Sequence, residues 1–404
     1  MIRKLHSLYN AYPRQFWLMV TGIFISTAGG SMIWPFILIF VSSKLNLPLS
    51  TTATLVTINA GTGLFSSLLA GSLADKTGRK NIMVSSMVLT GLAYIFMLRA
   101  TSYPAFAALM FLIGLSNPLY QVGADAMLAD LIPEKQRVDA YAINRIAVNA
   151  GFAFGPAVGG FVAGQSYDLA FYGAATGMLL HGLLLFLLAR ETLDKSQSKT
   201  QPQDAPEGYA RVLKDRNYLA FVLASALGLT APTMLWILLP IYVKSNFGIP
   251  ESQYGWIPTT NALMCVFVQY FVTLLTRRGR ALSVVAAGMF IYALGTGSVA
   301  LMTGFWGFWS SMVILTLGEL TLVPTSSKYV ADRAPADLRG RYMSIYWLAW
   351  GLARAVAPII GGFLNDAISP TAIWYGGMAI GLVSAFGLFV LARRESPKSL
   401  PASS

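Results

Sequence analysis

Long apolar stretches recur from Phe16 almost to the end of the chain, and each is close to the ~20 residues that a helix needs to cross a bilayer. Only 11% of the 404 residues are charged, whereas soluble domains carry about a quarter. A closed β-barrel would instead need segments of about 10 residues with alternating polarity. The sequence therefore predicts an all-α polytopic membrane protein with twelve spanning helices, over residues 16–41, 51–73, 80–98, 104–128, 138–164, 168–189, 217–244, 253–275, 281–302, 306–329, 341–364 and 371–391.

The 29 lysines and arginines are distributed unevenly among the loops. They gather before the first predicted span, in every second loop after it and in the carboxyl tail, whereas the loops between contain only Lys44, Arg99 and Lys244. This is the positive-inside pattern, which predicts that both termini and the central loop lie in the cytoplasm. Topology thus accounts for the formal charge of +12, and we expect no nucleic-acid partner.

The two halves of the chain resemble each other at one constant offset. The matched residues are Trp34 with Trp236, Asn59 with Asn261, Asp130, Pro133 and Arg137 with Asp332, Pro335 and Arg339, and Pro156, Gly159 and Gly160 with Pro358, Gly361 and Gly362. The repeat predicts two pseudo-symmetric six-helix bundles, residues 1–190 and 217–404, joined by a polar cytoplasmic linker over 191–216. Such paired bundles transport by rocking about a site near the midplane, so the architecture itself suggests transport.

A short polar loop after the second predicted span has the spacing G-x-x-x-D-x-x-G-R-K, formed by Gly71, Asp75, Gly78, Arg79 and Lys80. Small residues and a turn glycine allow two helices to meet in a tight corner, and a carboxylate is stabilised at a helix amino-terminus. A merely basic turn would explain Arg79 and Lys80 but not Asp75. The loop resembles the signature loop of the major facilitator superfamily. The resemblance implies a cytoplasmic gate, in which Asp75 docks on the opposite half in the outward-facing state and Arg79 pairs with Asp130.

The fifth predicted span carries the pattern G-x-x-x-G-P-x-x-G-G, formed by Gly151, Gly155, Pro156, Gly159 and Gly160. Glycines four apart expose a groove for close helix packing, and a proline bends the helix. The pattern resembles the antiporter motif of the 12-helix bacterial drug/proton antiporters of the same superfamily, which implies a seal between the two halves. Ordinary small-residue packing is the alternative. One departure is Met110, which stands where many of these exchangers have an arginine tied to proton movement.

Few ionisable residues fall inside the predicted spans, and a charge at the bilayer centre costs roughly 2.5 to 3.5 kcal/mol, so each is a functional candidate. Glu319 and Arg354 lie halfway along neighbouring spans, and we expect them to meet, with Glu319 carrying the proton. A static ion pair between them is the alternative. Asp125 and Arg145 share a similar depth, which predicts a second, structural pair. We expect His181 to be packed and neutral. The proton-coupling candidates are thus Glu319, Arg354 and Asp125.

Aromatic and amide side chains are candidates for the lining of a substrate cavity. They are Trp34, Asn117, Gln121, Trp236, Asn261, Gln269, Tyr270, Tyr346 and Trp347. Such a lining suits amphipathic or cationic organic molecules, through apolar contact and cation–π attraction. The sequence has no GxxxxGK[ST] phosphate loop, so we expect an ion gradient and not ATP to drive the protein. One cysteine and two histidines do not support a metal site. We expect no enzyme activity and no cofactor, with protons as the coupling ion.

These residues and resemblances predict a secondary active transporter of the cell's inner membrane, a monomer surrounded by membrane lipids. We expect it to export small hydrophobic or cationic molecules in exchange for protons, by alternating access. Three alternatives stay open: a lipid or glycolipid flippase, a proton-coupled solute importer on the same fold, and a membrane sensor or scaffold that does not transport.

Overall fold

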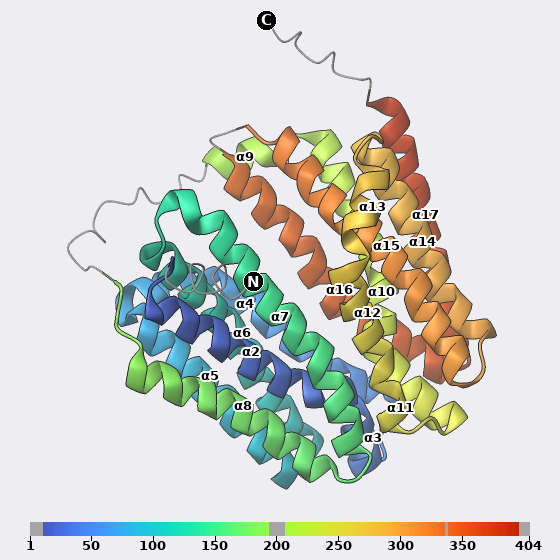
Figure 1. Ribbon diagram of the computed structural model, residues 1–404. Helices are drawn as coiled ribbons and strands as arrows, with labels where there is room; N and C mark the ends of the chain where they lie inside the picture. Colours follow the sequence, from blue (N-terminus) through green and yellow to red (C-terminus); the bar gives the residue numbers. More distant parts are fainter. Residues whose placement is uncertain (1–10, 194–206, 336–337, 396–404) are drawn as a thin grey trace, which may run out of the picture.

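The structure is a computed structural model that describes residues 11–193, 207–335 and 338–395 (Figure 1). Within these ranges eleven helices are long and apolar enough to cross a membrane, and a bent pair of helices makes a twelfth span. The predicted all-α fold and the twelve spans are confirmed. Residues 194–206, in the middle of the predicted linker, lie outside the described residues.

Six spans form the first bundle, shown in blue to green in Figure 1. Its elements are α2 (Arg14–Ile33), η1 (Trp34–Phe36), α3 (Ile37–Leu45), α4 (Leu49–Thr77), α5 (Arg79–Arg99), α6 (Tyr103–Leu131), α7 (Glu134–Ala163) and α8 (Tyr167–Leu188). α2 packs against α7 and α8, α4 packs against α6, and α5 packs against α6 and α8. The first span changes to a tighter 3-10 turn at η1, where Pro35 stands and cannot donate a backbone hydrogen bond.

The second bundle holds the other spans and a short surface helix that lies within the carboxyl-terminal part of the predicted linker. Its elements are α9 (Glu207–Leu213), α10 (Arg216–Phe247), α11 (Glu251–Tyr254), α12 (Trp256–Phe267), α13 (Gln269–Thr276), α14 (Ala281–Ser298), η2 (Val299–Leu301), α15 (Gly304–Arg333), α16 (Arg339–Ala367) and α17 (Ala372–Arg394). α14 packs against α15 and α17, and α10 packs against α16 and α17. Buried apolar residues of these helices belong to one hydrophobic cluster that extends through both bundles.

The span predicted as one helix over 253–275 is bent by 57°. The bend lies between Phe267 and Gln269, where no proline or glycine stands. At this point the Gln269 side chain donates a hydrogen bond to the Leu320 carbonyl on α15, with Nε2 and O 3.1 Å apart. The bend therefore coincides with a contact between Gln269 and α15, which the sequence alone does not predict.

The two bundles meet along α4 with α16, and along α7 with α11 and α12. On the first seam the Ser50 amide donates to the Asp366 carboxylate at 2.8 Å, and the Thr57 hydroxyl donates to the Ala355 carbonyl at 2.8 Å. The ribbons approach each other near α3 and α11 and diverge toward α9 (Figure 1). We call the end that holds α3 and α11 the closed end, and the end that holds α9 and the loop over residues 76–80 the basic end.

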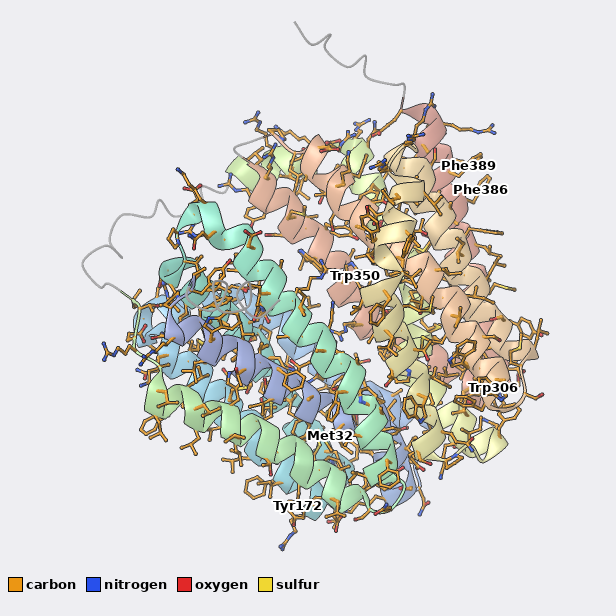
Figure 2. The ribbon with its side chains drawn as sticks, in the orientation of Figure 1. Met32, Tyr172, Trp306, Trp350, Phe386 and Phe389 are labelled. Atoms are coloured by element: carbon orange, nitrogen blue, oxygen red, sulfur yellow. The ribbon has the colours of Figure 1, made fainter. Side chains whose placement is uncertain are left out.

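Large apolar side chains cover the outside of both bundles. Trp306, Phe386 and Phe389 point away from the second bundle in Figure 2, and Trp306 and Phe386 are 73% and 68% exposed. Soluble proteins rarely expose extended apolar surfaces of this kind. The surface therefore matches a multi-pass membrane protein with its outer faces in lipid.

Candidate functional site

Glu319 lies halfway along α15, where a buried amide fixes its carboxyl group. The Asn261 Nδ2 atom on α12 donates to Glu319 Oε2 at 2.9 Å and to Thr316 Oγ1 at 3.0 Å. Both hydrogens of the amide are used by these two bonds. Asn261 is buried, so it holds the Glu319 carboxyl group toward α12.

The positive charge that acts on Glu319 comes from Arg145 on α7, in the other bundle. The predicted pairs were Glu319 with Arg354 and Asp125 with Arg145, and both predictions are wrong, because no ion pair among the described residues joins either couple. The reason is helix packing. α7 packs on α12, which packs on α15, and this order of helices brings Arg145 within electrostatic range of Glu319. Equal depth along two helices does not fix the direction in which their side chains point.

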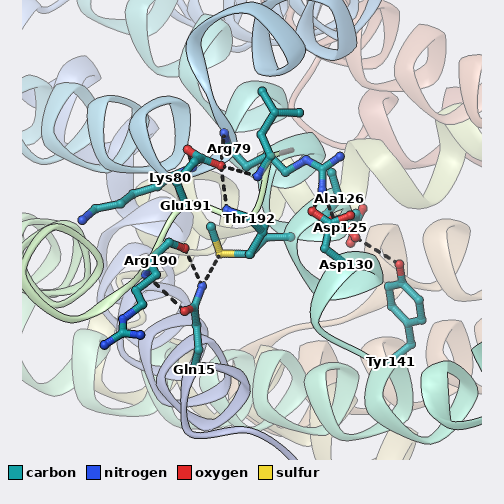
Figure 3. A network of polar contacts seen from close by, with 12 residues as sticks. Gln15, Arg79, Lys80, Asp125, Ala126, Asp130, Tyr141, Arg190, Glu191 and Thr192 are labelled. Atoms are coloured by element: carbon teal, nitrogen blue, oxygen red, sulfur yellow. Dashed lines mark hydrogen bonds and ion pairs between the residues drawn. The ribbon is translucent and has the colours of Figure 1, made fainter. Parts of the chain in front are cut away.

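Asp125 is held within its own bundle. Both of its carboxylate oxygens accept from Gln121 Nε2, one turn earlier on α6, at 3.2 Å. Its backbone carbonyl accepts from the Tyr141 hydroxyl on α7 at 3.2 Å (Figure 3). Asp125 therefore links α6 to α7 through local hydrogen bonds.

At the basic end, Arg79 forms the predicted ion pair with Asp130 (Figure 3). Its Nη1 atom also donates to the Ala126 carbonyl at 3.3 Å, which anchors the start of α5 on the end of α6. This contact, implied by the resemblance of the loop, is confirmed.

Glu191, which sequence reasoning missed, caps the same corner. It follows α8, and its carboxylate accepts from the backbone amides of Arg79 and Lys80 at 3.1 Å each. These amides lie in the first turn of α5, where a negative charge is favoured. Gly78 has φ +95°, and a Cβ there would collide with the Glu191 side chain. The turn glycine of the motif therefore makes room for an acid far away in the sequence.

The Asp75 carboxylate, the predicted docking group of the gate, contacts no polar partner among the described residues in this conformation. It is exposed, and in the part of the chain that the structure describes no hydrogen bond or ion pair involves its carboxylate. A Cβ added at Gly71, one turn earlier, would meet no atom within 4 Å. The gate surface on α4 is thus uncovered, in agreement with the divergence of the bundles at the basic end.

The glycine pattern of α7 serves two interfaces. Gly151, Gly155 and Gly159 face α2, where a Cβ at each would lie closer than 3.0 Å to Thr27, Ser31 and Met32 respectively. Gly160 faces the second bundle instead, since a Cβ there would collide with the Glu251 carbonyl. Pro156 lies on the same side, because its carbonyl leaves no room for a Cβ at Gly255. Both small-residue packing and contact between the halves are present.

Polar groups fasten the closed end where these helices meet. The Tyr167 hydroxyl on α8 donates to the Glu251 carboxylate of the other bundle, and the Lys244 Nζ atom lies 2.9 Å from the same carboxylate. Glu251 is only 4% exposed. The Thr259 hydroxyl on α12 also donates to the Ala153 carbonyl on α7 at 2.9 Å. Sequence reasoning missed this cluster, because Glu251 falls at the edge of a predicted span.

The structure brings some of the predicted cavity residues together. Trp34 and Trp236, which match in the repeat, line one pocket between the bundles with Pro35 and Met110. Asn117 and Gln121 lie on an exposed face of α6, and Asn261 belongs to the Glu319 cluster.

Other predicted cavity residues have different surroundings. Gln269 bonds to the backbone of α15, and Tyr270 packs on Phe271 of its own helix. Tyr346 is buried inside the second bundle and stacks on Phe221 at 5.8 Å, so the expectation that it lines a cavity is wrong. Trp347, its neighbour, is exposed.

The family model described as Major Facilitator Superfamily matches residues 19–237 and 221–404. The chain belongs to this superfamily. Curated relatives include the Na(+), Li(+), K(+)/H(+) antiporter of Planococcus maritimus, which is 25% identical over 396 residues and covers 90% of this chain and 91% of its own. Multidrug resistance protein 1 of Bacillus subtilis is 24% identical over 392 residues, with 96% and 97% covered.

Solved structures share the fold of this major facilitator protein. The nucleoside transporter NupG superposes with a TM-score of 0.80 at 12% identity and covers 95% of this chain and 100% of that one. A bacterial homologue of the human lysosomal transporter Spinster gives 0.78 at 13% identity, with 95% and 98% covered. Because the chain belongs to the Major Facilitator Superfamily, it is a membrane transporter and not an enzyme, as predicted.

Proposed function

We propose that this transporter exports small hydrophobic or cationic organic molecules in exchange for protons, by alternating access. The observation that carries the proposal is the position of Glu319, a carboxyl group in the middle of a span that lies within electrostatic range of Arg145 of the opposite bundle. The buried amide of Asn261 orients that carboxyl group. In the cell, the chain lies in the inner membrane with both termini and the linker in the cytoplasm.

The charge state of Glu319 links proton binding to substrate binding. As a carboxylate it attracts Arg145 and a cationic substrate alike, whereas the protonated group attracts neither. A proton that arrives from outside thus displaces a bound cation, and loss of that proton to the cytoplasm restores the site. Because Arg145 lies in the other bundle, the same proton also changes the attraction between the two bundles.

The conformation supports a gating role for the signature loop. Tyr167 and Glu251 join the two bundles at the closed end, and the bundles diverge toward the basic end (Figure 1). We propose that Asp75, uncovered here, docks on the second bundle when the molecule opens the other way, while Arg79 and Asp130 keep the corner of α4 and α5 rigid.

Exchange of alkali cations for protons is a second candidate function. It is favoured by the antiporter relative from Planococcus maritimus and by the oxygen atoms of Glu319 and Thr316 on α15, which lie close together because both accept from the Asn261 Nδ2 atom. Oxygen atoms are the ligands that hard cations take in proteins.

Proton flux in proteoliposomes tests both candidates. A pH-sensitive dye would report proton release when lipophilic cations, neutral drugs, lysolipids or salts of Na⁺, Li⁺ and K⁺ are added. We expect lipophilic compounds to drive proton counterflow in the wild type, and Glu319→Gln to abolish it. Asp332→Asn, which removes an exposed carboxylate, is the matched control and should leave the flux unchanged.

Each other result has a definite meaning. Flux driven only by alkali salts would establish the second candidate. Lysolipid movement without protons would indicate a flippase. If no compound moves protons, or if Glu319→Gln behaves as the wild type, the proposed coupling is wrong.

A further inference from the structure

Arg354 is an intramembrane cation for which the structure shows no internal partner. It lies halfway along α16, and none of the ion pairs and hydrogen bonds among the described residues involves its guanidinium group. The predicted partner, Glu319, accepts a hydrogen bond from Asn261 instead. A charge within a span is costly and usually marks a function, so the absence of a counter-ion needs an explanation.

The side chain of Arg354 points into the space between the bundles. Residues three or four apart share a face of a helix, so Arg354 lies on the same face of α16 as Trp347 and Trp350. The adjacent face, with Gly351 and Ala355, contacts α4. On the other side, Ala349 and Ala353 are buried in their own bundle. Arg354 is exposed between these two faces.

Aromatic side chains continue the same face toward the basic end. Trp350 is partly exposed on this face of α16. Its ring centroid lies 6.5 Å from that of Trp347, which is exposed. Toward the closed end the face is filled, since Pro358 and Gly361 are buried and a Cβ at Gly361 would collide with Leu238 of α10. Trp347, Trp350 and Arg354 therefore follow one another along this face of α16, and Arg354 is the one farthest from the basic end.

We propose that Arg354 binds the acidic group of a transported molecule whose aromatic body lies on Trp347 and Trp350. The planar fork of a guanidinium group matches the two oxygens of a carboxylate or a phosphate, and tryptophan offers a broad apolar face to a flat ring. The substrate range of the proposed exchanger, on which this inference rests, thus includes aromatic zwitterions that carry an acid as well as a positive charge.

A pair of dyes that differ in one group tests the proposal. Tetramethylrhodamine has a free carboxylate, which is converted to a neutral ester in tetramethylrhodamine methyl ester, and both carry the same delocalised cation. Binding to the purified protein would be measured by fluorescence polarisation. We expect Arg354→Gln to weaken binding of the carboxylate dye by about tenfold or more and to leave the ester unchanged, because charge-assisted hydrogen bonds are lost only with the carboxylate.

Two further variants make the result specific. Arg354→Lys keeps the charge but loses the fork, so the carboxylate dye should bind more weakly than to the wild type and the ester equally well. Arg278→Gln removes a positive charge from the loop between α13 and α14 and should change neither dye. Three results would overturn the proposal. Arg354→Gln could weaken the binding of both dyes equally, or Arg354→Lys could bind the carboxylate dye as tightly as the wild type does. The third is failure of the wild type to bind the carboxylate dye.

A lipid phosphate is the other source of an acidic group. The polarisation measurement is repeated in phosphatidylcholine nanodiscs with and without phosphatidylglycerol. We expect the dye affinities to be the same in both. Complete displacement of the carboxylate dye by phosphatidylglycerol would assign Arg354 to a lipid headgroup and overturn its assignment to a substrate. Binding needs no proton flux, so failure of the proton exchange and failure of this inference are separate results.

Discussion

Asp215 ties the start of α10 to the ends of two other helices. Its carboxylate accepts from the Tyr218 amide at 3.1 Å and from two nitrogens of Arg333 on α15 at 2.7 and 2.6 Å. Arg333 also pairs with Glu395 after α17. Partial burial raises the pKa of the Asp215 carboxyl group, but these hydrogen bonds outweigh it and hold the pKa below its ordinary value. A lowered pKa stabilises the fold above about pH 4, and that contribution is lost as the pH falls through the lowered pKa.

We expect Asp215→Asn to lower the thermal midpoint at neutral pH, because the guanidinium group of Arg333 then keeps only one acidic partner. The cost is about 1–3 kcal/mol. The variant should also show a smaller loss of stability below about pH 4 than the wild type. Thermal unfolding in detergent across pH measures both. Asp332→Asn is the control, since its pair with Lys328 is exposed and contributes little. Equal midpoints for the two variants would contradict the role of Asp215.

His181 is packed, as predicted, and its neighbour Gly22 makes that possible. The ring is fully buried, its Nδ1 atom lies 2.9 Å from the Ser26 hydroxyl, and Tyr120 meets it edge-on at 5.4 Å. A Cβ at Gly22 would overlap the imidazole. The absence of a side chain at Gly22 on α2 therefore leaves the space that the His181 ring of α8 fills.

Gly22→Ala should destabilise the first bundle by about 1–3 kcal/mol, the usual cost of overpacking a core. Adding His181→Ala should return part of that loss, since the smaller side chain removes the overlap. A double-mutant cycle on thermal midpoints gives the coupling. The control is Gly61→Ala, where a Cβ meets nothing within 4 Å. Strict additivity of the two substitutions would show that the overlap is relieved in some other way.

At the scale of elements, α7 packs against α2 of its own bundle and against α11 and α12 of the other bundle. Its glycines at four-residue spacing hold it against α2, and the adjacent Gly160 holds it against α11. A single helix face cannot serve both neighbours. The two glycines at the end of the motif therefore contact different helices. Gly159 faces α2 of the same bundle, and Gly160 faces α11 of the other bundle.

Gly160→Ala should loosen the closed end, because the added methyl group collides with the Glu251 backbone. A disulfide between Gly164→Cys and Ser252→Cys, whose helices lie side by side there, reports closure in a Cys265→Ser background. We expect the cross-linking yield to fall several-fold in Gly160→Ala and to stay unchanged in Gly61→Ala. Undiminished cross-linking would mean that the seam adapts to the methyl group.

The spans were predictable from sequence because span length follows directly from bilayer thickness and apolar content. The Arg79 and Asp130 pair was predictable because both residues belong to a recognisable motif. The pairing of Glu319 was not, since rotation about a helix axis depends on packing that the order of residues does not reveal. Glu191 was missed for a related reason, because its partners lie far away in the sequence. The 57° bend accompanies the Gln269 contact with α15, and no proline or glycine announced it.

At the scale of the whole molecule, the contacts between the two bundles at the closed end differ from the contacts at the basic end. Hydrogen bonds cross between them at the closed end from Ser50 and Tyr167, and farther along the seams from Thr57 and Thr259. At the basic end, the Arg79 and Asp130 pair and the Asp215 and Arg333 pair each stay within one bundle. A change of access that opens the closed end breaks the bonds that cross between the bundles there, so they contribute to the balance between the two states.

The Tyr167 hydroxyl is the contact of this seam that can be removed with the least disturbance. Tyr167→Phe deletes its hydrogen bond to the buried Glu251 carboxylate and keeps the ring. We expect the population that is open at this end to rise, about tenfold for each 1.4 kcal/mol lost. Spin labels at Thr101→Cys and Thr303→Cys, both exposed in closed-end loops of different bundles, would then show a longer distance component. Tyr172→Phe, an exposed tyrosine on the same helix, should leave the distances unchanged. An unaltered distribution in Tyr167→Phe would show that the glycine contacts of α7 hold the closed end without the hydroxyl.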